Sequence, residues 1–307
     1  MYSQTVIERT KPAYVSTLEE REVSTSLLGE ESKVEVLEFL ERRPFHTVML
    51  NGQIRDNGVV NRLNRGDFYG CRNQRGELEG VALIGHATLV ETSTDRALRA
   101  FAYLARKCSW THMIMGESER LEEFWAYYFD DDRRMNRSCR ETLLEFRWPI
   151  EVRPEVPGLR LATLDDLDLL LPVHAQMAYE ESGVDPFEQD PDGFRDRCAR
   201  RIEQGRTWVW IERGQLVFKA DVVSQTPNVT YLEGIWVSPE KRSEGWGTRC
   251  LSQITRRLLM KAPSVCVFVN EKNLAAQRFY SRAGFKSRAV YDTVFLNPSA
   301  KVPLYYS

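Results

Sequence analysis

The chain has few of the features that identify several large classes of protein. No apolar run approaches the length of a membrane-spanning helix, and the polar start, MYSQTVIERTKPAY, contains no signal-peptide core. The 4 histidines and 6 cysteines are scattered and show no paired CxxC spacing, so the sequence indicates no metal site. We therefore expect a cytoplasmic protein with reduced cysteines, without metal and without membrane contact.

The sequence also lacks a strong charge of either sign. Lysine and arginine total 42, and aspartate and glutamate total 44, which gives a formal net charge of -2. Neither half is polybasic, so the electrostatic signature of a nucleic-acid-binding protein is missing. The 307 residues, 42% hydrophobic and 28% charged, have the composition of a soluble globular protein long enough for two ordinary domains.

One stretch of the chain predicts a strand, a loop and a helix start in direct succession. It covers residues 231–248 and has the sequence YLEGIWVSPEKRSEGWGT. Pro239 ends the strand, because proline has no amide proton for a sheet, and an amphipathic run follows Gly247. Glycines in the loop would let the backbone approach a phosphate, which the unpaired amides and the dipole of a helix start favour. The glycine spacing fits neither a Walker A loop nor G-x-G-x-x-G.

The spacing Arg-x-x-Gly-x-Gly at 242–247 resembles the pyrophosphate-binding motif of the GNAT N-acetyltransferases, (Gln/Arg)-x-x-Gly-x-(Gly/Ala). Residues 265–285 resemble the next strand and helix of that family, which end in Tyr-x-x-x-Gly-Phe, here at 280–285. The resemblance covers roughly residues 159–296, about half of the chain. It implies an acyltransferase that uses acetyl-CoA and releases CoA.

The resemblance also implies which residues bind the acyl donor. The loop and helix start would hold the pyrophosphate, and the backbone of Val237 would pair with the pantetheine amides. Asn270 and Asn273 would touch the pantetheine arm, although a role as helix N-cap alone explains Asn273. Ser243 and Glu244 depart from the family pattern, and the charge of Glu244 beside a diphosphate predicts modest affinity. The full set of predicted donor-binding residues is Ile235, Trp236, Val237, Arg242, Ser243, Glu244, Gly245, Trp246, Gly247, Thr248, Asn270, Asn273, Ala276, Phe279 and Tyr280.

Acetyl transfer to an amine requires a base, because a protonated amine has no lone pair with which to attack. Period-two alternation predicts that Glu233 shares one strand face with Tyr231, Ile235 and Val237. A carboxylate on such a face is costly unless it is paired or used. The resemblance implies that Glu233 accepts the amine proton, usually through water. The alternative is a structural partner for an arginine.

The departing thiolate leaves more easily if it receives a proton, and the resemblance implies that Tyr280 supplies it. The alternative for Tyr280 is a packed aromatic residue that uses its hydroxyl as a polar handle. Cys250 and Cys266 lie in apolar surroundings without a paired histidine, which argues against an acetyl-cysteine route. We therefore expect direct attack in a ternary complex.

The acceptor side is marked by an acidic segment. Residues 180–192 contain six carboxylates and no basic residue, and in GNAT folds this segment helps to form the acceptor site. Such a segment suits a cationic acceptor, which could be a small amine, a polyamine or a peptide or protein amine. The alternative is a solvated loop in which Asp192 caps the next helix. The candidate substrate residues are Glu180, Glu181, Asp221 and Glu233, with Asp221 and His174 as reserve bases.

The order of predicted elements in the second half repeats that of the first. We therefore expect an α/β (α+β) protein with two GNAT-like domains in tandem, each a mixed, mostly antiparallel twisted sheet flanked by helices. The boundaries are a polar lead-in at 1–30, a degenerate domain at 31–152, a linker at 153–158 and a catalytic domain at 159–307. The first domain lacks a glycine loop after Val90, so it should bind no CoA. It resembles an uncharacterised domain that precedes bacterial GNAT domains; an unrelated α+β domain is the alternative.

Three functions remain open at this point. The first is an acetyl-CoA-dependent N-acyltransferase, which intact Glu233 and Tyr280 favour. The second is a non-catalytic module that binds acyl-CoA and regulates a partner. The third is an aminoacyl-tRNA-dependent transferase, against which the phosphate loop and the absence of a basic surface argue. The acceptor amine and the choice between monomer and homodimer are open as well.

Overall fold

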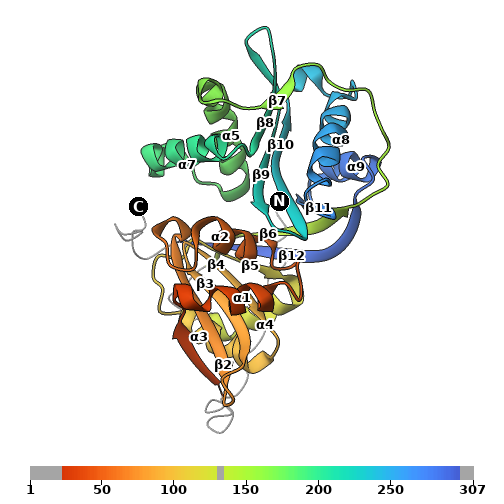
Figure 1. Cartoon of the computed structure of the whole chain (residues 1–307). Helices are drawn as coiled ribbons and strands as arrows, with labels where there is room; N and C mark the ends of the chain where they lie inside the picture. Colours follow the sequence, from red (N-terminus) through yellow and green to blue (C-terminus); the bar gives the residue numbers. More distant parts are fainter. Residues whose placement is uncertain (1–22, 130–134, 298–307) are drawn as a thin grey trace.

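The structure is a computed structural model that describes residues 23–129 and 135–297. Its centre is a single sheet of twelve strands, in the order β1-β2-β3-β4-β5-β12-β6-β11-β10-β9-β8-β7. Helices cover both faces of this sheet (Figure 1). The predicted architecture of mixed, mostly antiparallel strands flanked by helices is therefore confirmed.

The first half of the chain supplies six strands and four α-helices among its described residues. They are β1 (Val23–Leu27), α1 (Lys33–Leu40), α2 (Val48–Asn57), β2 (Gly66–Asn73), β3 (Leu78–Gly85), β4 (Ala87–Thr92), α3 (Asp95–Ala105), β5 (Met113–Glu117), α4 (Ser118–Tyr128) and β6 (Met135–Phe146). Strand β1 falls within the predicted lead-in, of which residues 1–22 lie outside the described residues. It was missed because an edge strand pairs on one side only, here with β2, and its side chains are mostly exposed.

Up to residue 297, where the described part of the chain ends, the second half supplies the other six strands and five α-helices. They are β7 (Leu159–Leu161), α5 (Leu167–Ser182), α6 (Pro186–Gln189), α7 (Pro191–Glu203), β8 (Thr207–Glu212), β9 (Gln215–Gln225), β10 (Val229–Val237), α8 (Trp246–Leu258), β11 (Ser264–Asn270), α9 (Leu274–Arg282) and β12 (Lys286–Leu296). In Figure 1, α5 and α7 lie on one side of β8, β9 and β10, and α8 and α9 lie on the other.

The last strands of the two halves are exchanged. Strand β6 lies antiparallel between β11 and β12, although it belongs in sequence to the first half. Strand β12 pairs antiparallel with β5 of the first half and with β6. The two halves are therefore consecutive in sequence but interleaved in the sheet, and the core under α1 and α2 contains Leu143, Tyr231 and Tyr291.

Polar contacts at both ends of α2 also join the first half to the second. Ser224 Oγ donates to the carbonyl oxygen of Val48 at 2.5 Å. The Arg206 guanidinium forms an ion pair of 2.5 Å with Asp56, and Arg200 Nη2 donates to Asn57 Oδ1 at 2.7 Å. These contacts place α2 against the edge of β9 and α7, so the two halves also meet outside the exchanged strands.

Each half contains one pair of parallel strands that pair only at their beginnings. In the second half, residues 229–231 of β10 pair with 264–266 of β11, and no pairing follows. In the first half, residues 87–89 of β4 pair with 113–115 of β5, and the pairing again stops. Two strands that diverge in this way leave a space between their C-terminal ends, one such space in each half.

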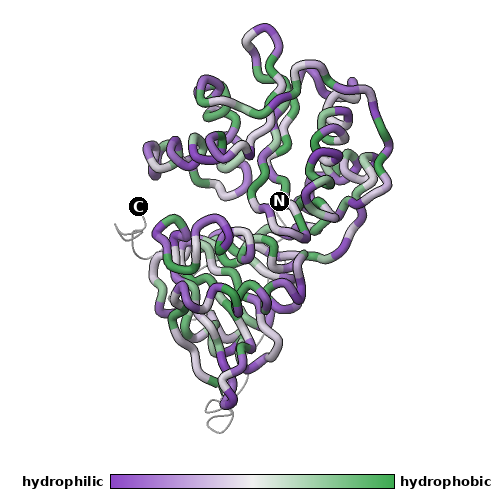
Figure 2. The backbone as a smooth tube through the Cα atoms, viewed as in Figure 1, coloured by the Kyte–Doolittle hydropathy of each residue, from purple (hydrophilic) through white to green (hydrophobic). Residues whose placement is uncertain are grey.

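The polarity of the chain agrees with its layered fold. Figure 2 shows hydrophobic and hydrophilic residues alternating along most strands and helices, as expected for elements that each turn one face to a core. Within the described residues, every helix is too short or too polar to cross a membrane. All six cysteines are free thiols, and five of them are buried.

Candidate active site

Strand β10 contains a β-bulge next to the predicted base. Glu233 pairs with Asp221 and Trp236 pairs with Lys219, so β10 contains one residue more than β9 between these two pairs. Gly234 takes the left-handed conformation there, with φ of 60°, and its carbonyl oxygen accepts from Lys219 Nζ at 2.9 Å. The glycine is needed because a Cβ atom would lie 2.6 Å from that nitrogen.

The bulge corrects the prediction that Tyr231, Glu233, Ile235 and Val237 share one face. Tyr231 packs in the core under α1 and α2. Ile235 and Val237 instead pack against the core under α8 and α9, on the opposite face of the sheet. Simple alternation fails because the extra residue reverses the phase of the strand after Glu233.

The bulge is held by a buried ion pair. Lys219 Nζ lies 2.7 Å from Asp221 Oδ2, and the exposed fractions of the two side chains are 0% and 1%. Thr207 Oγ1 donates to Asp221 Oδ1 at 2.8 Å. Burial acts to raise the pKa of Asp221, but the charges of Lys219 and Arg201 hold it below its usual range. Asp221 is therefore a structural residue, and its predicted roles as substrate contact and reserve base are not supported.

His174 is likewise a poor base. Burial and the charge of Lys219 lower its pKa to about 3, against the opposing effect of Asp221. Its Nδ1 lies 3.8 Å from Asp221 Oδ2, so the imidazole sits at the edge of the buried ion pair.

Glu233 has a hydroxyl partner and lies open to solvent. Tyr231 donates its hydroxyl proton to Glu233 Oε2 at 3.0 Å, and the residue is exposed. Among the ion pairs of residues 23–129 and 135–297, none within 4.0 Å involves Glu233. The nearest candidate for an arginine partner is Arg201, whose Nη1 lies 3.8 Å from Asp221 Oδ2. Burial acts to lower the pKa of Arg201, but the charges of Asp221 and Glu233 raise it. The carboxylate is thus oriented by one hydrogen bond and accessible to a substrate.

A second carboxylate of this site comes from the first half of the chain. Glu141 lies on β6, pairs across the sheet with Asn270 and Tyr291, and is half-buried. Burial and the charge of Glu233 raise the pKa of Glu141 to about 7. Sequence reasoning missed Glu141 because only the strand exchange brings β6 next to β11.

Of the acidic segment, Glu181 joins this group. Glu181 is exposed as a whole residue, but protein atoms around its carboxyl group partly exclude water. This desolvation and the charges of Glu233 and Glu141 raise the pKa of Glu181. Glu180 is also exposed and accepts a hydrogen bond of 2.9 Å from Gln176, so it is not part of the group. Asp190, and not Asp192, caps helix α7 by accepting from the amide of Gly193 at 3.0 Å.

Tyr280, the predicted acid, lies on α9 and is 8% exposed. Its ring packs against Phe279 and Phe285 at centroid distances of 5.1 and 5.4 Å. Burial and the charge of Glu233 raise the pKa of Tyr280, which shows that its hydroxyl and the Glu233 carboxylate sense each other. Within the described part of the chain, the hydroxyl has no hydrogen-bond partner, so it keeps its proton and is free to donate it.

The predicted phosphate loop leads into an uncapped helix. Ser243 and Gly245 both have left-handed backbone, with φ of 65° and 83°, and Gly245 is the N-cap of α8 without a side-chain hydrogen bond. Arg242 Nε donates to the carbonyl oxygen of Val237 at 3.0 Å. The first amides of α8 therefore remain available to an anion.

Glu244 is held in place by a hydrogen bond from a neighbouring side chain. The indole Nε1 of Trp246 donates to Glu244 Oε2 at 2.9 Å, and the Arg249 guanidinium stands 4.4 Å from the Trp246 ring centroid. Gly247 has a packing role, because a Cβ atom there would lie 3.0 Å from Val237 Cγ2 and 3.2 Å from the Phe279 ring.

The two asparagines proposed for the pantetheine arm are already engaged. Asn270 Nδ2 donates to Cys139 Sγ at 2.9 Å, and its Oδ1 accepts from the amide of Lys272 at 2.8 Å. Asn273 Oδ1 caps α9 by accepting from the amide of Ala276 at 3.0 Å. The capping role of Asn273 is therefore present, and side-chain contacts with a pantetheine arm stay predictions.

The corresponding connection in the first half is short and its helix start is capped. Only Ser93 and Thr94 connect β4 to α3, and Thr94 caps that helix through the amide of Ala97. Thr94 also donates to the Glu79 carboxylate at 2.9 Å, which places a negative charge near the helix start. These contacts support the prediction that the first half binds no CoA, which remains to be tested.

Comparison with known proteins agrees with this geometry. A family model described as the Acetyltransferase (GNAT) family matches residues 174–285. Residues 174–285 therefore form a GNAT acetyltransferase domain, and the suspected family is confirmed for this part of the chain. A comparison with curated proteins gave no match.

Solved structures extend the likeness to both halves. A GNAT-family acetyltransferase from Colwellia psychrerythraea is 12% identical, with 89% of this chain and 99% of that chain covered and a TM-score of 0.54. A tandem GNAT protein from the clavulanic acid biosynthesis pathway is 15% identical, with 91% and 100% covered and a TM-score of 0.56. A GCN5-related N-acetyltransferase from Sphaerobacter thermophilus is 11% identical, with 93% and 98% covered and a TM-score of 0.59. At these identities the likeness is one of fold, and it confirms the tandem GNAT architecture.

Proposed function

We propose that the protein is an acetyl-CoA-dependent N-acyltransferase whose active site lies in the second half of the chain. One observation carries this proposal: Glu233 is the exposed carboxylate of β10 just beyond the point where its pairing with β11 stops, and the same strand leads through the glycine loop to the uncapped start of α8. Tyr280, on α9, lies within range of the charge of Glu233, which together with burial raises the pKa of its hydroxyl. A base, an acid and an anion site are the three elements that acyl transfer from a CoA thioester to an amine requires.

The donor would be held by backbone groups more than by side chains. The free amides at the start of α8 would bind the diphosphate of acetyl-CoA, and the unpaired edge of β10 after the bulge would pair with the pantetheine amides. The fit is supported by the left-handed Gly245, around which a Cβ atom would meet no protein atom within 4 Å. That open space is where the diphosphate would lie.

In the proposed reaction, Glu233 accepts a proton from the protonated amine, directly or through water. The freed nitrogen forms a bond with the acetyl carbonyl carbon while the bond from that carbon to sulfur breaks. Tyr280 donates its proton to the departing sulfur and recovers, directly or through water, the second proton that the acetylated nitrogen loses. Glu233 releases the first proton to solvent, so the products are an N-acetyl amide, CoA and one released proton.

An acetyl-cysteine intermediate is disfavoured. Burial raises the pKa of the Cys250 thiol to about 12, and burial raises that of Cys266 as well. Both thiols are fully buried and would remain protonated and unreactive at neutral pH. Direct attack in a ternary complex is the mechanism that these surroundings favour.

The acceptor that suits this site is a cationic amine. Burial raises the pKa of the Tyr231 phenol, and the charges of Glu233, Glu141 and Glu181 raise it further, so the three carboxylates lie within electrostatic range of that hydroxyl. A second positive charge on the acceptor, as in a diamine or a peptide with a basic side chain, would relieve the repulsion among these carboxylates.

Initial rates with acetyl-CoA and a panel of amines, followed through release of the CoA thiol, test this function. Intersecting lines in a two-substrate analysis are expected, with diamines better substrates than monoamines of equal length. Parallel lines would contradict direct attack. CoA binding by calorimetry without turnover of any amine would instead favour the non-catalytic regulatory module.

A further inference from the structure

A cavity of about 50 Å³ lies in the first half of the chain, apart from the site just described. It occupies the space between β4 and β5 beyond the point where their pairing stops, and α2, α3 and α4 contribute to its walls. Neither Glu233 nor Tyr280 lines it. The fold thus repeats in the first half the opening that β10 and β11 form in the second.

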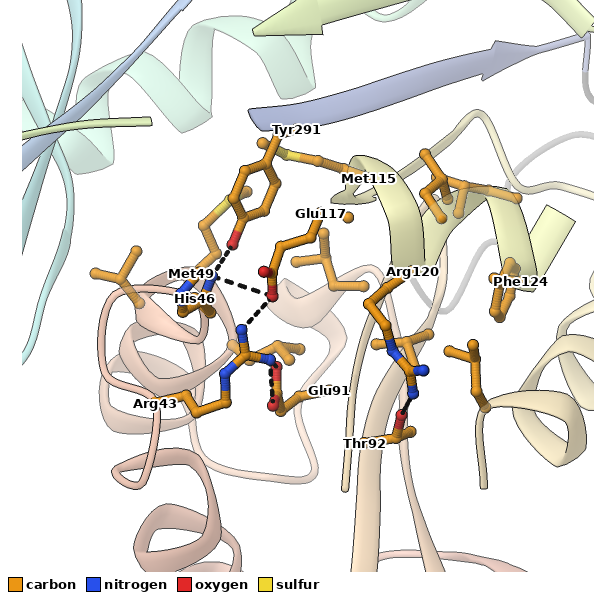
Figure 3. A pocket seen from close by; sticks show the side chains of 18 of the residues that line it. Arg43, His46, Met49, Glu91, Thr92, Met115, Glu117, Arg120, Phe124 and Tyr291 are labelled. Atoms are coloured by element: carbon orange, nitrogen blue, oxygen red, sulfur yellow. Dashed lines mark hydrogen bonds and ion pairs between the residues drawn. The ribbon is translucent and has the colours of Figure 1, made fainter. Parts of the chain in front are cut away.

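One wall of this cavity is a polar network (Figure 3). Arg43 Nη1 lies 3.1 Å from Glu91 Oε1, and Arg43 Nη2 also pairs with Glu117. His46 Nδ1 lies 3.1 Å from Glu117 Oε1 and 2.9 Å from the Tyr291 hydroxyl. Figure 3 shows the Glu117 carboxylate between Arg43 and His46, facing the interior.

The rest of the lining is mostly apolar. It is formed by side chains from the strands and helices on both sides, chiefly Met49, Leu89, Leu98, Met115, Phe124 and Phe268. A cavity with one charged and one apolar wall suits a ligand with a charged head and a small hydrocarbon body.

The charges of the polar wall favour a cation. Two carboxylates, Glu91 and Glu117, face one guanidinium, and His46 adds a positive charge only when it is protonated. The other arginine of the lining, Arg120, is paired with the exposed carboxylates of Asp95 and Glu123.

Glu91 is the residue that would gain most from a cationic ligand. It is only 8% exposed, and burial raises its pKa although Arg43 opposes this effect. A buried carboxylate that shares one guanidinium with a second carboxylate is incompletely neutralised, and a positive charge placed beside it would stabilise its ionised form.

We propose that this cavity is a second binding site, for a small organic ammonium ion. The ammonium group would lie beside Glu91 and Glu117, and the alkyl group would lie against Met49, Leu89 and Met115. The volume admits roughly three to five non-hydrogen atoms. The two-residue connection and the capped helix start after β4 argue against CoA as its ligand.

The site can be tested with propylammonium as the ligand. Binding is followed through the NMR signals of the methionine methyl groups. Met49 and Met115 line the cavity, whereas Met260 is 74% exposed and serves as internal reference. In the full chain labelled with ¹³C at the methionine methyl groups, millimolar propylammonium should shift the Met49 and Met115 signals saturably and leave Met260 unchanged. Propan-1-ol, of the same size but neutral, should bind at least about tenfold more weakly.

Variants separate this site from the proposed active site. Glu91→Gln should weaken propylammonium binding about tenfold or more, while Glu123→Gln, on the exposed side of Arg120, should leave it unchanged. Leu89→Phe, which adds volume to the apolar wall, should abolish the shifts even if Glu91→Gln fails to fold. Glu233→Gln should preserve them.

The Glu233→Gln control is needed because packed aromatic rings connect the cavity to the proposed active site. Tyr291 contacts Phe268 at 4.9 Å, Phe268 contacts Tyr231 at 5.2 Å, and Tyr231 donates to Glu233. Equal binding of propan-1-ol, an unchanged affinity in Glu91→Gln, or loss of the shifts in Glu233→Gln would each overturn the proposal. The first two would leave the proposed acyltransferase activity untouched, so the two ideas fail independently.

Discussion

Replacing Gly245 by valine tests the donor site most directly. Gly245 has φ of 83° at the N-cap of α8, and a Cβ atom there would meet no protein atom within 4 Å. The substitution therefore causes no clash within the protein. Its side chain would instead occupy the space proposed for the diphosphate of acetyl-CoA.

Gly245→Val should affect two quantities, the free energy of unfolding and the affinity for CoA. A left-handed backbone costs an L-residue about 1–2 kcal/mol, so Gly245→Val should lower the free energy of unfolding by at least that amount. Blocking the contacts between the diphosphate and the helix start should weaken CoA binding at least tenfold, which corresponds to about 1.4 kcal/mol.

A matched control separates the two effects. Gly76, in the turn between β2 and β3, has φ of 80° and likewise no atom within 4 Å of a Cβ position. Gly76→Val should lose about the same stability in thermal unfolding but should bind CoA like the unchanged chain in calorimetry. If both variants bound CoA with equal affinity, the loop before α8 would not be the donor site.

Four further predictions follow from the geometry. Glu233→Gln should lower the acetylation rate by about two orders of magnitude near neutral pH and by less at high pH, where the amine is already free; a constant loss across a pH profile would contradict its role as base. Tyr280→Phe should cost a similar factor and leave CoA affinity nearly unchanged, which single-turnover rates and calorimetry would check together. The pKa of Glu141 in the folded chain, about 7, exceeds its ordinary value of 4.5, so the free energy of unfolding should fall as pH rises between these values. Glu141→Gln should remove that fall. In denaturant titrations the variant should be more stable than the parent by about 1–3 kcal/mol at pH ~9 but not at pH ~4. Residues 159–307 expressed alone lack β6 and should be poorly soluble, and a soluble, active fragment would refute the importance of the strand exchange.

The sequence predicted the elements well where local signals are strong. The turn at Pro239 and the glycines at 245 and 247 locate the end of β10 and the start of α8 correctly, because proline and left-handed glycine act on the backbone itself. The short helix α6 has only four residues within the acidic segment, too few to produce a helical pattern in the sequence.

The candidate site was less predictable because long-range contacts define it. The bulge at Gly234 depends on Lys219 of the neighbouring strand, and no local pattern reveals that reversal of phase. Glu141 reaches the acceptor side only through a strand that leaves its own half. Asp221 was predicted as a substrate residue because the sequence does not show that its side chain is buried. Lys219, two residues earlier on the same strand, is buried with it as an ion pair.

The exchange of β6 and β12 also fixes when this protein can fold during synthesis. Domains generally fold one after another as the ribosome releases them. Here β5 pairs with β4 but cannot acquire its second neighbour in the sheet, β12, until residues 286–296 have been made, and β6 must wait for β11 and β12. The first half therefore leaves the ribosome with an unpaired strand and an open sheet edge, which expose it to aggregation for the time that translation of the second half requires. Translation speed and chaperone supply should accordingly affect the yield of this chain more than that of a protein whose domains each complete their own sheet.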